Sequence, residues 1–205
     1  MAQTELTFPM PPLSGSVVGL SIADRYDDLR VPLLQTRIGG TAPTVGKLRD
    51  DGAGSTGVYS FAFSNSAVDE VLFETQMPHD WEPGTTIYWH VHWTAGNNSV
   101  AQAGKVVRWK LEYTKSDNNA NTIPLTQFLV AEDTITGTAY AGEITADIPL
   151  TMVGCDSSCV LICRFFRDNT VANNAPVSIF AMSTDFHYLR SRIGTINHEY
   201  PFGGG

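Results

Sequence analysis

Apolar and polar residues alternate over several short stretches of the chain from residue 58 onward. A period of two is typical of β-strands, because successive side chains point to opposite faces of a sheet. The clearest stretch covers residues 104–114. Its predicted inward-facing residues are Val107, Trp109, Leu111 and Tyr113, and its predicted outward-facing residues are Arg108, Lys110, Glu112 and Thr114. Further strands are expected at residues 58–63, 70–76, 85–94, 125–131, 134–140, 143–150, 160–167 and 177–188.

Eight or nine short strands with turn-rich connections predict an all-β domain. The architecture that this pattern favours is an antiparallel β-sandwich or barrel. A weak helical signal is confined to residues 21–29.

The first 57 residues show no steady period and contain five prolines. Proline favours extended backbone and donates no hydrogen bond to a sheet. The region still carries more apolar side chains than a free tail normally has. We therefore expect an extended N-terminal arm at 1–57, a sandwich at 58–190 and a C-terminal tail at 191–205. The arm would pack on its own domain or on a neighbouring subunit, and its candidate contact residues are Phe8, Met10, Leu13, Leu29, Val31, Leu33 and Leu34.

Composition narrows the classes of partner. Hydrophobic residues make up 42% of the 205-residue chain and charged residues only 17%, which suggests that another chain covers part of the surface. The net charge of -8 argues against nucleic-acid binding, which needs a basic face. No apolar run approaches the roughly 18 residues of a membrane span. The N-terminus lacks the features of a signal peptide, so we expect synthesis in a cytoplasm and no membrane partner.

The most distinctive polar residues lie in the strand predicted at 85–94. His90 and His92 are two residues apart and therefore share a face with Tyr88, opposite the apolar face. Asp185 and His187 share a face of the last predicted strand. If the two strands are neighbours, these imidazoles and the carboxylate converge in a set suited to zinc, iron or nickel.

Two other interpretations of these histidines stay open. A hydrogen-bonded cluster at the edge of the core is the more common role for such histidines and is our expectation, so no metal or cofactor is predicted. A contact between subunits is the third interpretation. The spacing of Gly84, His90 and His92 also resembles the opening of the first cupin motif, which implies a metal or small-molecule binder. However, the positions where that motif needs a glutamate hold glycine and asparagine, at 96–98.

Catalytic motifs are missing from the sequence. It contains no G-x-S-x-G elbow, P-loop or H-E-x-x-H, and the adjacent His79 and Asp80 have no partnered nucleophile. We expect that the protein is not an enzyme. Cys155, Cys159 and Cys163 lack the paired spacing of structural zinc sites and are expected to be reduced, structural thiols. Arg164 and Arg167 are expected to form an ion pair with Asp168 at a strand end.

Several segments together resemble a known family. They are DDLRVP at 27–32, PHDW at 78–81, GTTIYWHVHW at 84–93, FRD at 166–168 and DFHY at 185–188. Their order resembles a family of structural proteins encoded by tailed bacteriophages and prophages. The resemblance implies a virion component with a jelly-roll-like β-sandwich, made in the host cytoplasm.

The expected function is that of a capsid decoration, or cement, protein that binds the major capsid protein and stabilises the head. A protein that binds a symmetric lattice is most naturally a closed oligomer, and we expect a homotrimer. A connector, tail or fibre-base component of the virion is the alternative within this class.

Overall fold

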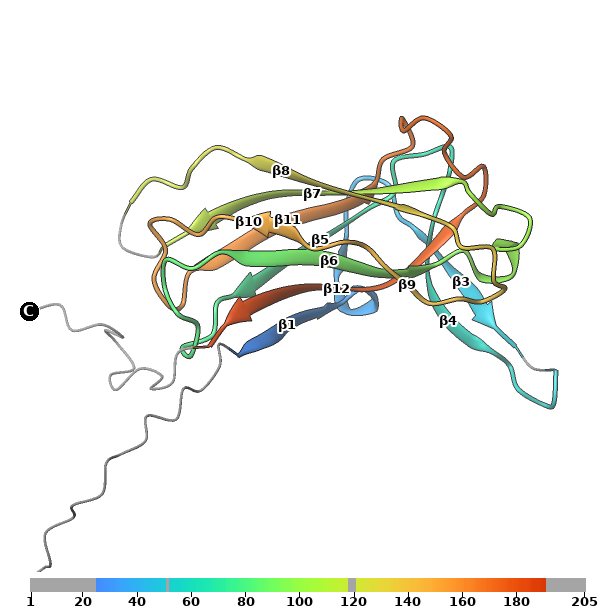
Figure 1. The fold of residues 1–205 in the computed structure, drawn as a ribbon, viewed down its shortest axis with the longest axis horizontal. Helices are drawn as coiled ribbons and strands as arrows, with labels where there is room; N and C mark the ends of the chain where they lie inside the picture. Colours follow the sequence, from blue (N-terminus) through green and yellow to red (C-terminus); the bar gives the residue numbers. More distant parts are fainter. Residues whose placement is uncertain (1–24, 51, 118–120, 191–205) are drawn as a thin grey trace, which may run out of the picture.

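The predicted β pattern is realised as two antiparallel sheets in a computed structural model, which describes residues 25–50, 52–117 and 121–190 (Figure 1). The seven-stranded sheet contains β1 (Tyr26–Pro32), β3 (Thr44–Arg49), β4 (Val58–Phe63), β6 (Ile87–Thr94), β9 (Glu143–Ile144), β10 (Ile148–Leu150) and β12 (Ile179–Leu189). The five-stranded sheet contains β2 (Arg37–Ile38), β5 (Glu70–Gln76), β7 (Val106–Ser116), β8 (Gln127–Thr134) and β11 (Val160–Arg167). Two short 3-10 helices, η1 (Leu33–Gln35) and η2 (Gly96–Asn98), complete the described elements.

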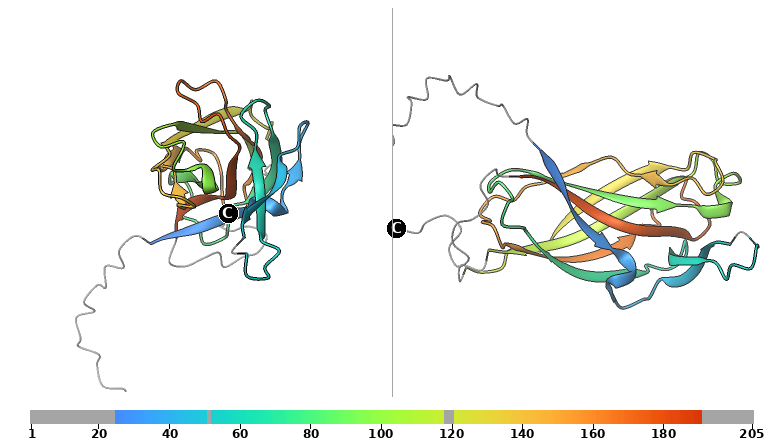
Figure 2. Two further views of the ribbon diagram at one scale, coloured as in Figure 1. Left: turned by 90° about the vertical axis from the view of Figure 1, so that its right-hand side faces the viewer. Right: turned by 90° about the horizontal axis from the view of Figure 1, so that it is seen from below.

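The strand order is that of a jelly roll. One sheet contains β4, β12, β6 and β10 in that order, and the other contains β5, β11, β7 and β8. When these eight strands are numbered along the chain, the two sheets become 1-8-3-6 and 2-7-4-5, which is the connectivity of two Greek keys. The end-on view in Figure 2 shows the sheets as two layers around the core. The predicted antiparallel β-sandwich of jelly-roll type is confirmed.

Aromatic side chains fill the space between the sheets. Trp89 and Trp93 from β6 and Trp109 from β7 have no solvent-exposed surface. The ring of Phe165 stacks on Trp109 with the ring centroids 5.2 Å apart. The inward-facing residues expected on β7 are all buried, because alternate residues of that strand point between the sheets. β6 thus has one face fixed by the core, and its other face is turned outward.

The boundary predicted at residue 57 is corrected by the structure. All seven residues of β1 pair with β12, and β3 pairs with β4, so residues 26–49 belong to the sandwich. Pairing with β1 satisfies backbone groups along an edge of β12 that would otherwise be open. The weak helical signal at 21–29 is also wrong for residues 26–29, which are strand.

The arm's candidate contact residues divide accordingly. Val31 and Leu33 are buried in the sandwich core, so these two are core residues rather than subunit contacts. Leu29 packs against the core but is only partly buried, so it stays a candidate. Leu34 is 49% exposed and stays a candidate. Phe8, Met10 and Leu13, like the tail at 191–205, lie outside the described residues.

Two strand predictions are also corrected. The stretch 134–140 is a loop beyond Thr134, and 143–150 contains two short strands instead of one. In the described ranges, no helix is long and apolar enough to cross a membrane.

Candidate functional site

A cluster of histidines and carboxylates lies on the outer face of the seven-stranded sheet. β6 and β12 are antiparallel neighbours, with Asp185 opposite His90 and Ser183 opposite His92 (Figure 1). The tryptophans of β6 face the core, so the histidines that alternate with them along the strand face outward. Cross-strand partners point to the same face of a sheet, so Asp185 and Ser183 face outward as well. The convergence that depended on these two strands being neighbours is therefore present.

The tightest part of the cluster consists of His90, His92 and Asp185. Nε2 of His92 lies 3.0 Å from Nε2 of His90 and 3.0 Å from Oδ2 of Asp185. Nε2 of His90 lies 3.7 Å from the same Oδ2 atom. Two imidazole nitrogens and one carboxylate oxygen thus lie within 3.7 Å of one another.

A second layer surrounds this group. Oδ1 of Asp147 lies 3.2 Å from Nδ1 of His90, and its Oδ2 lies 3.5 Å from Nδ1 of His187. Nε2 of His187 lies 3.0 Å from Oδ1 of Asp28 on β1. His187, a candidate ligand by sequence, therefore stands beside the inner group and packs its ring on His90, with centroids 4.4 Å apart.

Asp147 and Asp28 were not found from the sequence. Asp28 reaches the cluster because it lies opposite His187 in the pairing of β1 with β12, a register that the sequence does not reveal. Asp147 is carried there by the connection between β9 and β10, which both pair with β6.

The inner residues are well shielded from solvent. His90 is 3% exposed and Asp185 is 4% exposed. Nδ1 of His90 and Oδ1 of Asp185 are buried atoms without a hydrogen-bond partner. The carboxylate of Asp185 raises the pKa of His90 against the opposing effect of burial. Burial disfavours the charged form of Asp185, but the neighbouring imidazoles of His90 and His92 outweigh it and lower the pKa of that carboxyl.

The cluster lines an open pocket of about 380 Å³. Arg30 and Ile144 contribute to its walls, and His92 reaches it with a side chain that is 31% exposed. The inner group can therefore be reached by a small ion or ligand from solvent.

A second charged cluster lies at the end of β11 and differs from the ion pair predicted there. Asp168 pairs with Lys110 at 2.8 Å and with Arg108 at 3.3 Å. Arg164 instead pairs with Glu70 and Glu112. The expected pairing of Arg164 and Arg167 with Asp168 is therefore wrong.

Arg167 is fully buried and is used to bind backbone. Its guanidinium donates hydrogen bonds to the carbonyl oxygens of Phe63, Val177 and Ala175. Burial lowers the pKa of Arg167 to about 10. The side chain ties the end of β4 to the connection between β11 and β12, which is a structural role.

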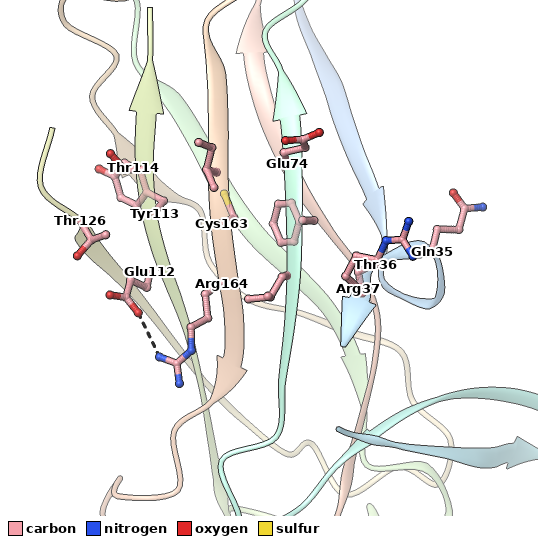
Figure 3. A pocket seen from close by; sticks show the side chains of 13 residues that line it. Gln35, Thr36, Arg37, Glu74, Glu112, Tyr113, Thr114, Thr126, Cys163 and Arg164 are labelled. Atoms are coloured by element: carbon pink, nitrogen blue, oxygen red, sulfur yellow. Dashed lines mark hydrogen bonds and ion pairs between the residues drawn. The ribbon is translucent and has the colours of Figure 1, made fainter. Parts of the chain in front are cut away.

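The outer face of the five-stranded sheet carries a hollow of about 660 Å³ (Figure 3). Its floor includes Leu72 and Ile162, which are 39% and 43% exposed. In Figure 3 the Arg164 side chain reaches toward Glu112 across the edge of this hollow. Its lining combines these apolar side chains with the charged pair of Arg164 and Glu112.

The remaining sequence candidates have structural surroundings. Nε2 of His79 lies 2.6 Å from the hydroxyl oxygen of Ser158, whereas Asp80 pairs with Arg190 and accepts a hydrogen bond from Tyr188. The three cysteines are free and buried, and burial raises the pKa of the Cys163 thiol, which disfavours the reactive thiolate.

Comparison with known proteins gives no family for the chain. No family model matches it, and no curated protein matches it. Among solved structures, the CBM22-2 xylan-binding domain from Paenibacillus barcinonensis Xyn10C has a TM-score of 0.41 at 13% identity, and the match covers 79% of this chain and 98% of that one.

Two further solved structures have TM-scores of 0.40 and 0.24. The CBM22-1 and GH10 modules of the Clostridium thermocellum endo-1,4-beta-D-xylanase 10B, complexed with xylohexaose, give a TM-score of 0.40 at 11% identity. That match covers 80% of this chain but only 28% of the xylanase chain. The stem and receptor-binding domain of spike protein P1 from bacteriophage PM2 gives a TM-score of 0.24 at 9% identity, covering 76% and 67%. Similarities of this size carry no argument about ligand or function.

Proposed function

We propose that this protein is a structural component of a tailed-bacteriophage virion, a decoration protein that binds the capsid as a homotrimer and stabilises the head. The observation that carries the proposal is the placement of the segments that resemble such proteins. The segments at 27–32, 84–93 and 185–188 lie far apart in the sequence, yet they fall on β1, β6 and β12, three adjacent strands.

The other two segments support the same part of the fold. Trp81, from the PHDW segment, is fully buried and forms a bridge to Arg190 just beyond β12. Arg167, from the FRD segment, ties the loop before β12 to the end of β4 through its carbonyl contacts. The resemblance therefore corresponds to one assembled region rather than to scattered residues.

The outer face of the five-stranded sheet favours an oligomer, and we assign the subunit contact to a second copy of this chain on that face. Leu72, Ile162, Phe128 and Val130 are each 39–57% exposed there. Exposed apolar residues gathered on one face are characteristic of protein contacts. The low charge content of the chain agrees with a surface that is partly covered.

Native mass spectrometry of the purified protein tests the trimer, which would have three times the 22.3 kDa mass of the chain. Ile162→Glu should convert the trimer to monomer, because it places a charge in the contact. Val100→Glu is the matched control, since Val100 is 64% exposed and lies outside that sheet. A wild-type monomer at micromolar concentration would contradict the trimer.

Quantitative mass spectrometry of virions from the phage that encodes the chain tests the position. A decoration protein should be present in copy numbers comparable with the major capsid protein. A copy number far below that would support the alternative, a connector, tail or fibre-base component. Absence from the virion would contradict both.

A further inference from the structure

We propose that His90, His92 and Asp185 form a binding site for one divalent transition-metal ion, with zinc as the best-fitting ion. This inference concerns the outer face of the seven-stranded sheet and does not depend on the proposed virion role. It rests on the spacing of three ligand atoms, on buried atoms without partners and on the arrangement of the carboxylate behind one histidine.

The spacing of the three atoms suits a common metal centre. Their separations are 3.0, 3.0 and 3.7 Å. Imidazole nitrogens and carboxylate oxygens bind zinc at about 2.0–2.2 Å, so two ligands of a tetrahedral ion lie about 3.3–3.6 Å apart. The observed separations bracket that value. An ion can therefore be accepted with side-chain shifts of a few tenths of an ångström.

The position of the His90 proton is also compatible with a bound metal ion. Each neutral imidazole has one N–H group, and an ionised carboxylate has none. If His90 offers the lone pair of Nε2 to a metal, its proton is on Nδ1, which lies 3.2 Å from Oδ1 of Asp147 and needs only a reorientation of the ring to donate a hydrogen bond to it. A carboxylate behind a metal-bound histidine fixes the ring and increases its basicity.

The buried atoms show what the cluster lacks. Nδ1 of His90 and Oδ1 of Asp185 have no hydrogen-bond partner, although both residues are more than nine-tenths buried. An unsatisfied buried polar group carries a free-energy cost. A bound cation would offset this cost by neutralising Asp185 and by orienting His90 toward Asp147.

The donor set selects the kind of ion. Two imidazoles and one carboxylate suit zinc and other first-row divalent ions, whereas Mg²⁺ and Ca²⁺ prefer oxygen ligands. Three protein ligands leave coordination positions open toward the 380 Å³ pocket, for water or a small anion. A second group, His90, Asp147 and His187, competes for His90, but its carboxylate is much more exposed: the side chain of Asp147 is 50% exposed and that of Asp185 is 6% exposed. The group with the buried carboxylate is therefore the assigned site.

The experiment measures zinc bound by the full chain. After treatment with a chelator and dialysis, Zn²⁺ is titrated by calorimetry, and Co²⁺ is added separately to record its visible absorption. We expect about one Zn²⁺ per chain and an absorption band typical of a four- or five-coordinate Co²⁺ site. Ca²⁺ in place of Zn²⁺ should give no binding isotherm.

Variants locate the bound ion. His92→Gln should weaken Zn²⁺ binding at least about 100-fold, and Asp147→Asn, which removes only the supporting carboxylate, about 10–100-fold. His79→Gln is the control, because it removes a histidine that contacts Ser158 away from the cluster. His92 is partly exposed, so its variant should fold, and tryptophan fluorescence checks that it does.

Three results would overturn the assignment. The first is a folded wild-type protein that binds no Zn²⁺. The second is Zn²⁺ binding that His92→Gln and Asp185→Asn both leave unchanged. The third is a loss of binding in His79→Gln as large as the loss in His92→Gln, which would move the ion to another site.

Discussion

Two aspartates in this protein are buried to the same degree but have different neighbours. Asp168 is 5% exposed and Asp185 is 4% exposed. Asp168 pairs with Lys110 and Arg108, and it accepts hydrogen bonds from the backbone N–H and the hydroxyl of Thr170. Asp185 has imidazoles as its close ionisable neighbours, and its Oδ1 atom has no hydrogen-bond partner.

The difference lies in what can neutralise each carboxylate. Lys110 and Arg108 are cationic at every ordinary pH, so the charge of Asp168 is balanced whenever the protein is folded. Although Asp185 raises the pKa of His90, an imidazole, unlike a lysine or arginine side chain, can lose its charge within the physiological pH range, and neutral imidazole is also a metal ligand. The cluster around Asp168 is therefore complete by itself, whereas the cluster around Asp185 gains from an added cation.

The largest effect is expected from Asp168→Ala. The substitution leaves two cations and the donors of Thr170 without their shared acceptor. Breaking a buried ion pair by removing one partner costs about 3–5 kcal/mol, and we expect the lower end because Arg108 and Lys110 are partly exposed. Urea denaturation measures the loss. Glu132→Ala is the control: it removes the more exposed partner of Arg108 and should cost at most about 1 kcal/mol. Equal losses in the two variants would show that Asp168 is not the centre of its cluster.

Zinc should produce the next largest effect, and at only one of the two aspartates. With Zn²⁺ at 100 times its dissociation constant, the free energy of unfolding of the wild-type protein should rise by about 2.7 kcal/mol relative to chelator. Asp185→Asn should abolish this rise, whereas Asp168→Asn should keep it. Thermal melts in chelator and in Zn²⁺ give the comparison. If both variants lost the zinc-dependent rise in stability, zinc binding would not distinguish the two carboxylates.

The sandwich could be predicted from the sequence because its strands carry a strong alternating pattern. The strands at 70–76 and 160–167 match the structure residue for residue, and Trp89, Trp93 and Trp109 are core residues as the pattern indicates. The region 26–49 was misassigned because proline and glycine interrupt its alternation. Pro32 is tolerated at the end of β1, where the strand gives way to η1.

The candidate site could be predicted only in part. The alternation placed His90 with His92 and Asp185 with His187, but the choice between a convergent site and two separate pairs depended on which strands are neighbours. That information is absent from the local sequence pattern, because 84 residues (95–178) separate β6 from β12. For the same reason, Asp28 and Asp147 had no signal, and the prediction that Asp168 pairs with nearby arginines chose sequence neighbours over Lys110 on β7.

Lowering the pH should produce a smaller change, in the stability difference between the wild type and Asp168→Asn. Burial by itself would raise the pKa of Asp168, but hydrogen bonds from Lys110, Thr170 and Arg108 outweigh it and hold the pKa well below its ordinary value of 3.8. A carboxyl with a lowered pKa stabilises the folded state above that ordinary value and loses this contribution as the pH falls toward its folded pKa. The stability gap between wild type and Asp168→Asn, measured by urea denaturation in chelator, should therefore be constant from pH 7 to about pH 5 and shrink below about pH 4. A gap that grows on acidification would contradict the lowered pKa.

The smallest effect is expected from Lys110→Met, which removes one cation and keeps the carboxylate. Lys110 is 30% exposed, so its ammonium group is partly solvated and its pair with Asp168 is screened. Arg108 and Thr170 still hold Asp168, so the free energy of unfolding should fall by no more than about 1 kcal/mol. The loss should decrease further in 1 M salt, and urea denaturation at low and high salt measures both values. A loss as large as that of Asp168→Ala would mean that the carboxylate depends on a single cation, and the two aspartates would then differ less than their surroundings indicate.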